Sequence, residues 1–437
     1  MTSLDRFFHI TERKSTIGRE IRGGVTTFLT MAYILLVNPG ILSAAGMSPT
    51  AAATSTALAA GVCCLLMGLW ANFPLALASG MGLNATLAFT LTPATGSWQA
   101  AMALIAIEGL VILLLVLAGL REAVMVAIPR HLRTAIGAGI GLFIAVIGLK
   151  NGKLIVADPN TLVTAGKLTD VHALITLGGL AITAILMVRK TPAGILIGVA
   201  VCTVAALLAG VSHWPAKFPA PDFSAVFQAD FAAAMHWKFV PLIFSVMLVD
   251  FFDTLGTATA VAEEGDLMDD NGRFPKLPQV LAADSVAASV GGVLGASSVT
   301  SYIESAAGVA EGARTGLHTV VVGILFLLAI LAAPLAAIIP DCATAPALIL
   351  VGFLMMAHVA DIDFSDFEHA IPAFLTILLI PLTFSIAHGV GYGFIAQVIL
   401  SVANGHAKKV HPLMYGVAGA FVLYFVSDAE WFKTMIG

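Results

Sequence analysis

Four polar residues within apolar stretches have the types and spacing to do chemistry: Asp250, Asp253, Glu304 and Asn84. Asp250 and Asp253 are three residues apart, which in a helix places both on one face. Two acids on one face of an apolar helix repel each other and lose hydration, so we expect at least one of them to bind and release a proton near neutral pH. We therefore interpret Asp250 and Asp253 as candidate proton-coupling groups.

The composition identifies the surroundings of these residues. Of the 437 residues, 59% are apolar and 11% are charged, and the mean hydropathy is +0.97. A soluble protein carries roughly 25% charged residues, so the composition excludes a soluble protein and predicts an all-α polytopic membrane protein in a lipid bilayer. The formal net charge of −5 indicates no nucleic acid partner.

Asn84 and Glu304 fall in two weak membrane segments, about 75–91 and 297–313, which are too polar or too rich in Gly for ordinary spans. Gly80 weakens the first helix, and the Ser/Thr run before Glu304 offers competing hydrogen bonds, so we expect neither segment to be one continuous helix. Non-helical backbone persists at membrane depth only beside protein or a water-filled cavity. Paired interrupted segments therefore predict a transporter's binding site, with an amide from Asn84 and a carboxylate from Glu304.

With these two segments included, fourteen spans precede residue 404. The apolar runs near the 20 residues that a bilayer requires are 24–42, 50–71, 98–120, 131–149, 172–188, 193–211, 238–262, 277–295, 317–338, 343–359, 369–386 and 387–403, and an extra run covers 411–427. With a cytoplasmic N-terminus, 15 of the 21 Lys and Arg residues fall in inside loops and five in outside loops. This excess follows the positive-inside rule and predicts that orientation.

The two halves of the chain resemble each other in order. Pro129 and Pro340 are 211 residues apart, as are Gly141 and Gly352, and the two weak segments obey nearly the same shift. Because seven is an odd number of spans, the second copy enters the membrane from the opposite side, which is the inverted topology of many secondary transporters. The predicted division is a cytoplasmic N-terminus (1–23), a first repeat (24–211), an extracytoplasmic linker (212–237), a second repeat (238–404) and a C-terminal segment with the extra run (405–437).

Other acidic residues have less specific surroundings. Glu108 and Asp284 stand alone in apolar spans, and we interpret them chiefly as residues that bridge neighbouring helices. The acidic stretch 263–275 lacks the ligand register and distal Glu of a calcium loop, so we expect a solvated cytoplasmic loop and no metal site. Neither an HExxH nor a GxSxG pattern occurs. We expect no enzyme, and no cofactor beyond a coupling proton.

Five motifs in order give a resemblance to a known family. They are residues 26–34 with 37–39 in the first span, 80–85 in the third, 252–254 with 256–257 in the eighth, 297–305 in the tenth, and 312–317 in the turn that follows. These motifs resemble those of the nucleobase/ascorbate transporter family, and within it the AzgA-like purine permeases. The resemblance covers nearly the whole length of the chain.

This resemblance implies fourteen helices in two inverted seven-helix repeats, with a core of spans one to four and eight to eleven and a gate of the remaining spans. Short antiparallel strands in spans three and ten would meet where the nucleobase binds. It also implies import of adenine, guanine or hypoxanthine with a proton, an elevator-like movement of core against gate, and a homodimer. Asn84, Asp250, Asp253 and Glu304 match the binding positions of that branch. Some members carry Asn in place of Asp250, which leaves its role and the preferred purine open.

Purine chemistry agrees with this implication. The base is flat and largely neutral, so a carboxylate can accept from its N–H donors and an amide can complement an edge with both donors and acceptors. We therefore hypothesise a proton-coupled purine permease of a bacterial inner membrane in which Glu304 and Asp253 hold the base and Asn84 completes the edge. Asp250 or Asp253 would exchange the coupling proton. Four aromatic residues are candidates for a stacking wall: Phe28, Phe251, Phe252 and Tyr302.

Two alternatives stay open. A carrier of uracil, xanthine or another organic solute would use the same fold and the same interrupted segments. A membrane prenyl transferase would need two acidic motifs near one face together with magnesium, and only residues 266–270 offer such a motif. Uptake that collapses with a protonophore but does not depend on metal would separate the transporter from the enzyme.

Overall fold

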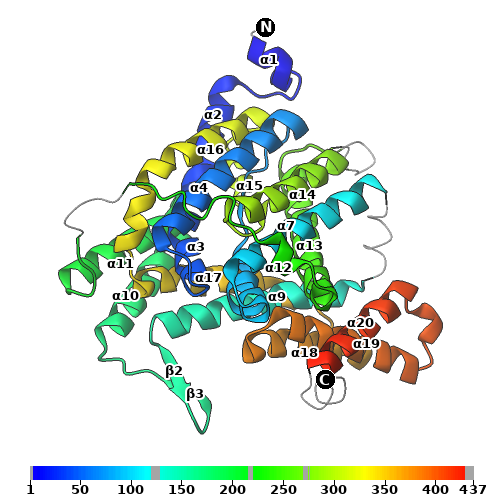
Figure 1. Cartoon of the computed structure of the whole chain (residues 1–437). Helices are drawn as coiled ribbons and strands as arrows, with labels where there is room; N and C mark the ends of the chain where they lie inside the picture. Colours follow the sequence, from blue (N-terminus) through cyan, green and yellow to red (C-terminus); the bar gives the residue numbers. More distant parts are fainter. Residues whose placement is uncertain (1–2, 120–127, 215–219, 269–273, 275, 429–437) are drawn as a thin grey trace.

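The computed structural model is mostly helical and describes residues 3–119, 128–214, 220–268, 274 and 276–428 (Figure 1). Within these residues, ten helical segments are long and apolar enough to cross a membrane, and three shorter apolar helices accompany them. A long apolar helix satisfies its own backbone hydrogen bonds, which is what lipid demands. The predicted all-helical polytopic class is therefore confirmed. Asp269 and Asp270 of the acidic stretch lie outside the described residues.

The apolar runs of the sequence correspond closely to the elements observed. In chain order these are α1 (Ser3–Phe8), α2 (Ile17–Met31), α3 (Ile34–Ser43), α4 (Pro49–Leu66), η1 (Met67–Ala71), β1 (Leu77–Ser79), α5 (Met81–Thr86), η2 (Leu87–Leu91), α6 (Thr92–Thr95), α7 (Trp98–Leu117), α9 (Arg130–Asn151), β2 (Ile155–Asp158), β3 (Leu162–Ala165), α10 (Val171–Val188), α11 (Gly194–Leu208), α12 (Phe231–Ala234), η3 (Trp237–Phe239), α13 (Val240–Glu264), α14 (Leu277–Leu294), β4 (Val299–Ser301), α15 (Ser305–Ala310), α16 (Gly316–Ala329), η4 (Ile330–Ile338), α17 (Asp341–Met356), η5 (Ala357–Asp361), α18 (Phe367–Thr383), α19 (Ile386–Ala403), η6 (Ala407–Lys409) and α20 (Pro412–Asp428).

The first span is two helices rather than one. α2 begins at Ile17, where the Thr16 side chain accepts a hydrogen bond from the backbone N–H of Arg19. This start lies seven residues before the predicted run because a polar helical turn precedes the apolar residues. α2 ends at Met31 and α3 begins at Ile34, which leaves Tyr33 at the break. The break matters because it brings Tyr33 to the second weak segment, as described below.

The two weak segments are interrupted, as expected. The first consists of β1 followed by the helical turns of α5, η2 and α6, and the second consists of β4 followed by α15. The two strands pair antiparallel, with Ala78 opposite Thr300.

The helices form two groups, which Figure 1 separates into an upper and a lower part. α2, α4, α7, α14, α15 and α16 pack against one another in the upper part, together with α3 and α13 at its lower edge. α9, α10, α11, α17, α18, α19 and α20 pack against one another in the lower part. Fewer contacts join the groups, and most of these involve α3, α5 and α13. The strand pair and its following helices belong to the upper group.

The lower group is organised around the crossing of α9 and α17. Gly141 of α9 and Gly352 of α17 face each other there, since a Cβ atom at Gly141 would lie 2.7 Å from the carbonyl oxygen of Gly352. Only glycines allow two helix backbones to approach this closely. The offset of 211 residues between these glycines, recognised in the sequence, thus corresponds to a direct helix contact.

Helix pairs elsewhere recur in the two halves of the chain. α4 packs against α16 through glycines that include Gly61 and Gly323, and α14 packs against α7 through Gly292 and Gly109. In the lower group, the α10–α11 pair has its counterpart in α18–α19, and α10–α17 in α18–α9. Each kind of helix pair therefore occurs twice. In the second pair, the two halves of the chain have exchanged the helices that they contribute.

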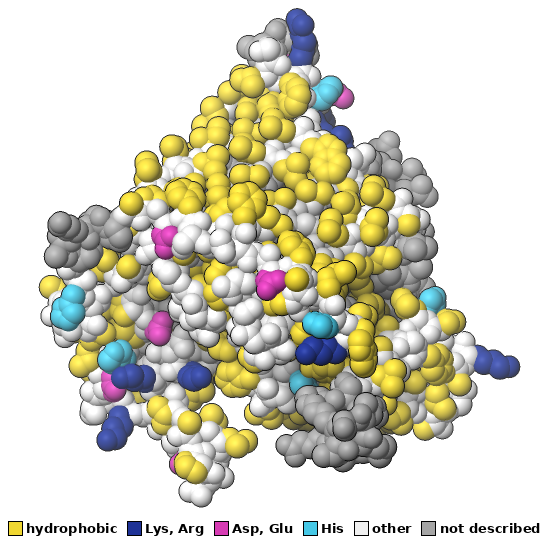
Figure 2. Space-filling model, in the orientation of Figure 1, with side chains coloured by type: hydrophobic (Ala, Val, Ile, Leu, Met, Phe, Trp, Pro, Cys, Tyr) yellow, Lys and Arg dark blue, Asp and Glu magenta, His cyan; other side chains and the backbone are white. Residues whose placement is uncertain are grey.

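The upper part of one face of the molecule is largely apolar. Figure 2 shows hydrophobic side chains over most of it, with Lys and Arg residues at the upper tip and in the lower part. The β2–β3 hairpin projects from the lower part (Figure 1), and its β3 strand is exposed along its length. An exposed apolar area of this kind fits a protein surrounded by lipid.

Candidate functional site at the strand crossing

Two three-residue strands from distant parts of the chain cross inside the upper helix group. Besides the β1–β4 ladder, Gly80 N–H donates to the Ser298 carbonyl (2.9 Å) and Tyr302 N–H donates to the Ala76 carbonyl (3.0 Å). All residues of both strands are buried. Because each strand satisfies the backbone of the other, extended chain is tolerated at this depth.

Polar side chains hold the crossing in place. The Tyr302 hydroxyl donates to the carbonyl of Ser79 (2.6 Å), at the end of β1. Asn38 donates from its amide nitrogen to the hydroxyls of Thr56 (2.8 Å) and Ser79 (3.0 Å), and the Ser79 hydroxyl donates to the carbonyl of Ala296. These groups are buried, and each bond inside an apolar interior is strengthened by its low dielectric surroundings. The strand crossing is therefore held by side-chain hydrogen bonds in addition to its backbone ladder.

Glu304 lies at the start of α15, shortly after β4 of the strand crossing, and is partly exposed. Its Oε1 atom accepts a hydrogen bond of 2.6 Å from the hydroxyl of Tyr33, which is 1% exposed. The bond fixes the direction of the carboxylate and leaves its second oxygen for another donor. Sequence reasoning missed Tyr33, because a Tyr in an apolar span gives no signal of its own and its partner is 271 positions away.

Asn84 is fully buried in α5, close behind the first strand. Its Oδ1 atom accepts from the Ser79 hydroxyl (2.8 Å). Its amide nitrogen has no hydrogen-bond acceptor within the described part of the chain. A buried, unpartnered amide has unused donors, which is the property expected of a group that completes a ligand's edge.

Asp253 is exposed although it lies halfway along α13. α13 contacts α5, α7, α14 and α15, and it also contacts α9, α19 and α20. One turn on, a Cβ atom added at Gly256 would meet nothing within 4 Å. Asp253 interacts electrostatically with both Glu304 and Asp250, so the structure brings these three acids near one another.

Asp250 lies deeper than Asp253 and is 0% exposed. Its Oδ2 atom accepts from the Ser298 hydroxyl (3.1 Å), next to the strand crossing. Two further acids surround it. Glu108 of α7 is within hydrogen-bonding reach of Asp250, and Asp284 of α14 interacts with it electrostatically. Glu108 and Asp284, which the sequence suggested as isolated bridging residues, therefore form one buried cluster with Asp250.

Both carboxylate oxygens of Asp284 accept hydrogen bonds. Its two oxygens accept from the hydroxyls of Thr254 (2.6 Å) and Ser301 (2.9 Å), and the hydroxyls of Thr254 and Thr300 are 2.9 Å apart. This network ties α13 and α14 to β4. Within the described residues, no group of three or more His, Cys, Asp or Glu side chains has the arrangement to hold a metal ion.

The aromatic candidates for a stacking wall differ in their surroundings. Tyr302 and Phe251 are buried beside the crossing, with Tyr302 committed to the carbonyl of Ser79. Phe28 packs edge-on against Phe326, with ring centres 5.1 Å apart. The side chain of Phe252 lies outside the described structure.

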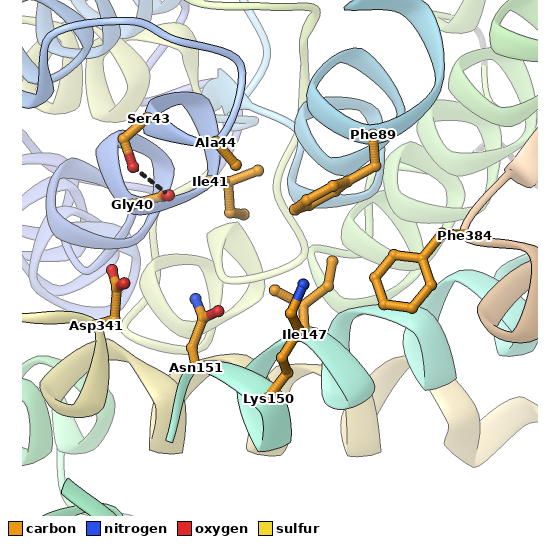
Figure 3. A pocket seen from close by; sticks show the side chains of 10 residues that line it. All are labelled: Gly40, Ile41, Ser43, Ala44, Phe89, Ile147, Lys150, Asn151, Asp341 and Phe384. Carbon is orange, nitrogen blue, oxygen red and sulfur yellow. Dashed lines mark hydrogen bonds between the residues drawn. The ribbon is translucent and has the colours of Figure 1, made fainter. Parts of the chain in front are cut away.

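A separate pocket of about 200 Å³ opens between the two helix groups (Figure 3). Ser43 of α3 and Phe89 of η2 line it from the upper group, and Lys150 of α9 and Phe384 line it from the lower group. The Lys150 ammonium lies 5.5 Å from the centre of the Phe384 ring, and the Phe89 and Phe384 ring centres are 6.0 Å apart. The pocket lining does not include Asn84, Asp250, Asp253 or Glu304.

Comparison with known proteins gives consistent matches. Residues 18–392 match a family model described as a permease family. The chain is 44% identical to the guanine/hypoxanthine permease PbuG of Bacillus subtilis, over 97% of this chain and 99% of that protein. It is 41% identical to the adenine permease AdeP of Escherichia coli, over 97% of this chain and 96% of that protein. Among solved structures, the transmembrane domain of a cyanobacterium bicarbonate transporter, BicA, has a TM-score of 0.63 at 18% identity and covers 85% of this chain and 96% of that domain, which indicates a shared fold.

Proposed function

Because the chain belongs to the nucleobase/ascorbate transporter family of permeases, we propose that it is a proton-coupled permease for a purine nucleobase: adenine, guanine or hypoxanthine. Relatives that align with nearly the whole chain are named as permeases for these three bases. The family and these relatives are transporters and not enzymes, so the prenyl transferase alternative is excluded.

The observation that carries the proposal is the proximity of Glu304 and Asp253 beside the strand crossing, and we place the substrate cavity between them. Two carboxylates can accept hydrogen bonds from the N–H groups of a purine. Asn84 would complete the edge with its unused amide donors. Such pairing selects the base strongly, because a wrong base leaves buried polar groups without partners.

Asp250 has a different role in this proposal. It is fully buried and bonded to Ser298, so it supports the substrate site from behind the strand and takes part in exchange of the coupling proton. Asp253, which is exposed to the cavity, links the proton to water. Both acids thus serve coupling, and Asp253 also touches the base.

The finer architecture is part of the same proposal. Two inverted repeats of seven spans, 24–211 and 238–404, would supply fourteen crossings, with the segments 1–23, 212–237 and 405–437 outside the repeats. The recurrent helix pairs, the Gly141–Gly352 contact and the antiparallel strand pair support this arrangement. The upper group would be the core that carries the base, and the lower group the gate.

We place the N-terminus in the cytoplasm of a bacterial inner membrane, on the strength of the 15 Lys and Arg residues among 21 that then face inside. Along α13 the residues 245–250 are buried, whereas Asp253, Gly256 and Ala260 are exposed toward the end at Glu264. In this orientation the cavity opens to the cytoplasm. Movement of the core against the gate, as in an elevator, would then expose the same site to the other side. A homodimer would give the gate a fixed support.

The proposal is tested by uptake into proteoliposomes that contain the purified protein. We expect labelled hypoxanthine to accumulate when the interior is alkaline, and a protonophore to abolish accumulation. Unlabelled adenine, guanine and hypoxanthine are expected to compete, in an order that identifies the preferred purine.

Liposomes without protein and liposomes with the gradient reversed are the controls. Competition by uracil or xanthine but by none of the three purines would favour the other carrier of the same fold. Absence of any base uptake, with the protein folded and inserted, would contradict the proposal.

A further inference from the structure

Two buried carboxyl groups face each other without a donor between them. Glu108 on α7 and Asp250 on α13 are each 0% exposed, and their carboxyl groups are within hydrogen-bonding reach of each other. Neither oxygen of Glu108 has a hydrogen-bond donor among the described residues, and the same holds for Oδ1 of Asp250. Three acceptor oxygens of two acids therefore share one dry space.

The neighbouring Asp284 differs in its hydrogen-bond donors. Both of its oxygens accept from hydroxyl groups, those of Thr254 and Ser301. Asp250 accepts from Ser298 on one oxygen and has the hydroxyl of Thr300 within hydrogen-bonding reach. Glu108 has no such donor among the described residues. Of the three acids, Glu108 is therefore the one without a hydroxyl donor.

The elements packed against α7 bring no positive charge to Glu108. α13 contributes Asp250 and α14 contributes Asp284, and both are acids. α12, η2 and α6, which also contact α7, contain no titratable residue, and Asp230 caps α12 near the start of α7. α7 itself carries no titratable residue other than Glu108. No Lys, Arg or His occurs in those described elements that contact α7, so none of them neutralises Glu108.

Binding of one proton would relieve the repulsion between these two carboxylates. Two bare carboxylates in a dry space lose hydration and repel each other, and each unsatisfied oxygen adds to the cost. A proton on one carboxyl group turns it into a donor to the other, and an O–H···O⁻ bond of this kind is short and strong. The proton then belongs to the pair rather than to either residue.

We propose that Glu108 and Asp250 form the proton-binding site of the carrier, in which one proton is shared between the Glu108 carboxyl group and Oδ1 of Asp250. The inference rests on the proposed function and assigns the coupling proton to a residue pair. In this proposal Glu108, which is fully buried, binds the proton and has no contact with the base.

The pair has a short connection to the substrate site. Asp250 binds Ser298 through its second oxygen, and the carbonyl of Ser298 accepts from Gly80 N–H at the strand crossing. Asp253, one turn along α13, faces both the cavity and Glu304. A proton therefore reaches the pair from the cavity by way of Asp253, and the occupied pair keeps Asp250 and Ser298 in the position that supports the crossing. Loss of the proton to the cytoplasm separates the two carboxylates and loosens that support.

The test is Glu108→Gln in proteoliposomes. A Gln side chain has nearly the same shape and provides an N–H donor to Asp250, but it cannot release a proton. We expect exchange of labelled hypoxanthine for unlabelled hypoxanthine, without a pH gradient, to stay within about twofold of the wild-type rate. Accumulation driven by the gradient should be lost, with the ratio of internal to external base at unity, and hypoxanthine should no longer evoke proton uptake. Glu311→Gln is the control, since Glu311 is exposed and paired with Arg22 at 3.1 Å; it should accumulate normally.

Asp250→Asn is the second variant, because its amide would donate to Glu108 and end the sharing of a proton. It should likewise lose accumulation driven by the pH gradient. Normal accumulation by Glu108→Gln overturns the proposal, and so does loss of exchange by that variant. Failure of both to fold also overturns it, since a neutral donor should satisfy the pair. Absence of transport by the wild-type protein would instead refute the proposed function.

Discussion

Acidic side chains a few turns apart have very different partners, and these partners determine what each can do. Glu304 accepts from one tyrosine and keeps an oxygen for a ligand. Asp253 is exposed and interacts electrostatically with Glu304. Asp284 is satisfied by two hydroxyls. An acid that is fully satisfied has a structural role, whereas an acid with an unused oxygen can bind.

The Tyr33–Glu304 hydrogen bond predicts that variants of the two residues weaken hypoxanthine binding to different extents. Glu304→Gln replaces an acceptor by an amide donor that opposes the N–H groups of the purine, so we expect the Kd for hypoxanthine to rise about a hundredfold. Tyr33→Phe leaves the carboxylate in place but removes its positioning bond, so we expect a rise of about tenfold. Equilibrium binding of labelled hypoxanthine to the purified variants measures both.

Tyr392→Phe is the matched control for the tyrosine, because Tyr392 is 44% exposed and its ring stacks on Phe425. Its Kd should equal that of the wild type. Equal binding by Glu304→Gln and wild type, with unchanged melting temperatures, would exclude Glu304 from the substrate site.

The sequence alone identifies a candidate site residue when burying that residue type in the membrane costs free energy. Asp250, Asp253 and Glu304 stand out for that reason. The sequence does not say which acids meet, and so the proximity of Glu108 to Asp250 could not be predicted. A tyrosine in an apolar span is ordinary, so the sequence gave no indication that Tyr33 contacts Glu304.

Helix packing determines where these residues lie. The α9–α17 crossing is the centre of the lower group, and its glycines allow the two backbones to touch. A Cβ atom at Gly141 would lie 2.7 Å from the Gly352 oxygen and 3.0 Å from the Met356 nitrogen. Both neighbours are backbone atoms, which cannot move aside without shifting α17.

Gly141→Ala should therefore force the two helices apart and destabilise the protein by about 1–3 kcal/mol. Gly137→Ala on the same helix is the control, because a Cβ atom there meets nothing within 4 Å. That control should be neutral or stabilising by up to about 1 kcal/mol, since Ala is the better helix former. Thermal unfolding of the purified variants measures the difference. A melting temperature for Gly141→Ala at or above that of Gly137→Ala would show that the crossing is not tight.

Most elements could be predicted from the sequence because long apolar runs have few alternatives in lipid. The interruption of the third and tenth segments followed from Gly80 and the Ser/Thr run. The break at Tyr33 did not, because no Gly or Pro stands at residues 32–33 and Pro39 lies beyond the break. The strand register that pairs Ala78 with Thr300 could also not be derived, since pairing depends on three-dimensional approach.

At the scale of the whole molecule, two helix groups share a restricted contact surface. The strand crossing and its acids belong to one group, while α13 and α5 touch the other. The pocket of Figure 3 lies on the same boundary, between Phe89 of one group and Phe384 of the other. Limited contact between the groups is what the proposed movement of core against gate requires. A base held at the crossing would travel with its group.

The central claim is that the two interrupted segments jointly bind an uncharged purine at their crossing. Structure determination of the protein with bound hypoxanthine tests this claim most directly. We expect the base beside β1 and β4, within hydrogen-bonding distance of both Glu304 and Asp253. A base bound only between Phe89 and Phe384, with the crossing empty, would contradict the claim.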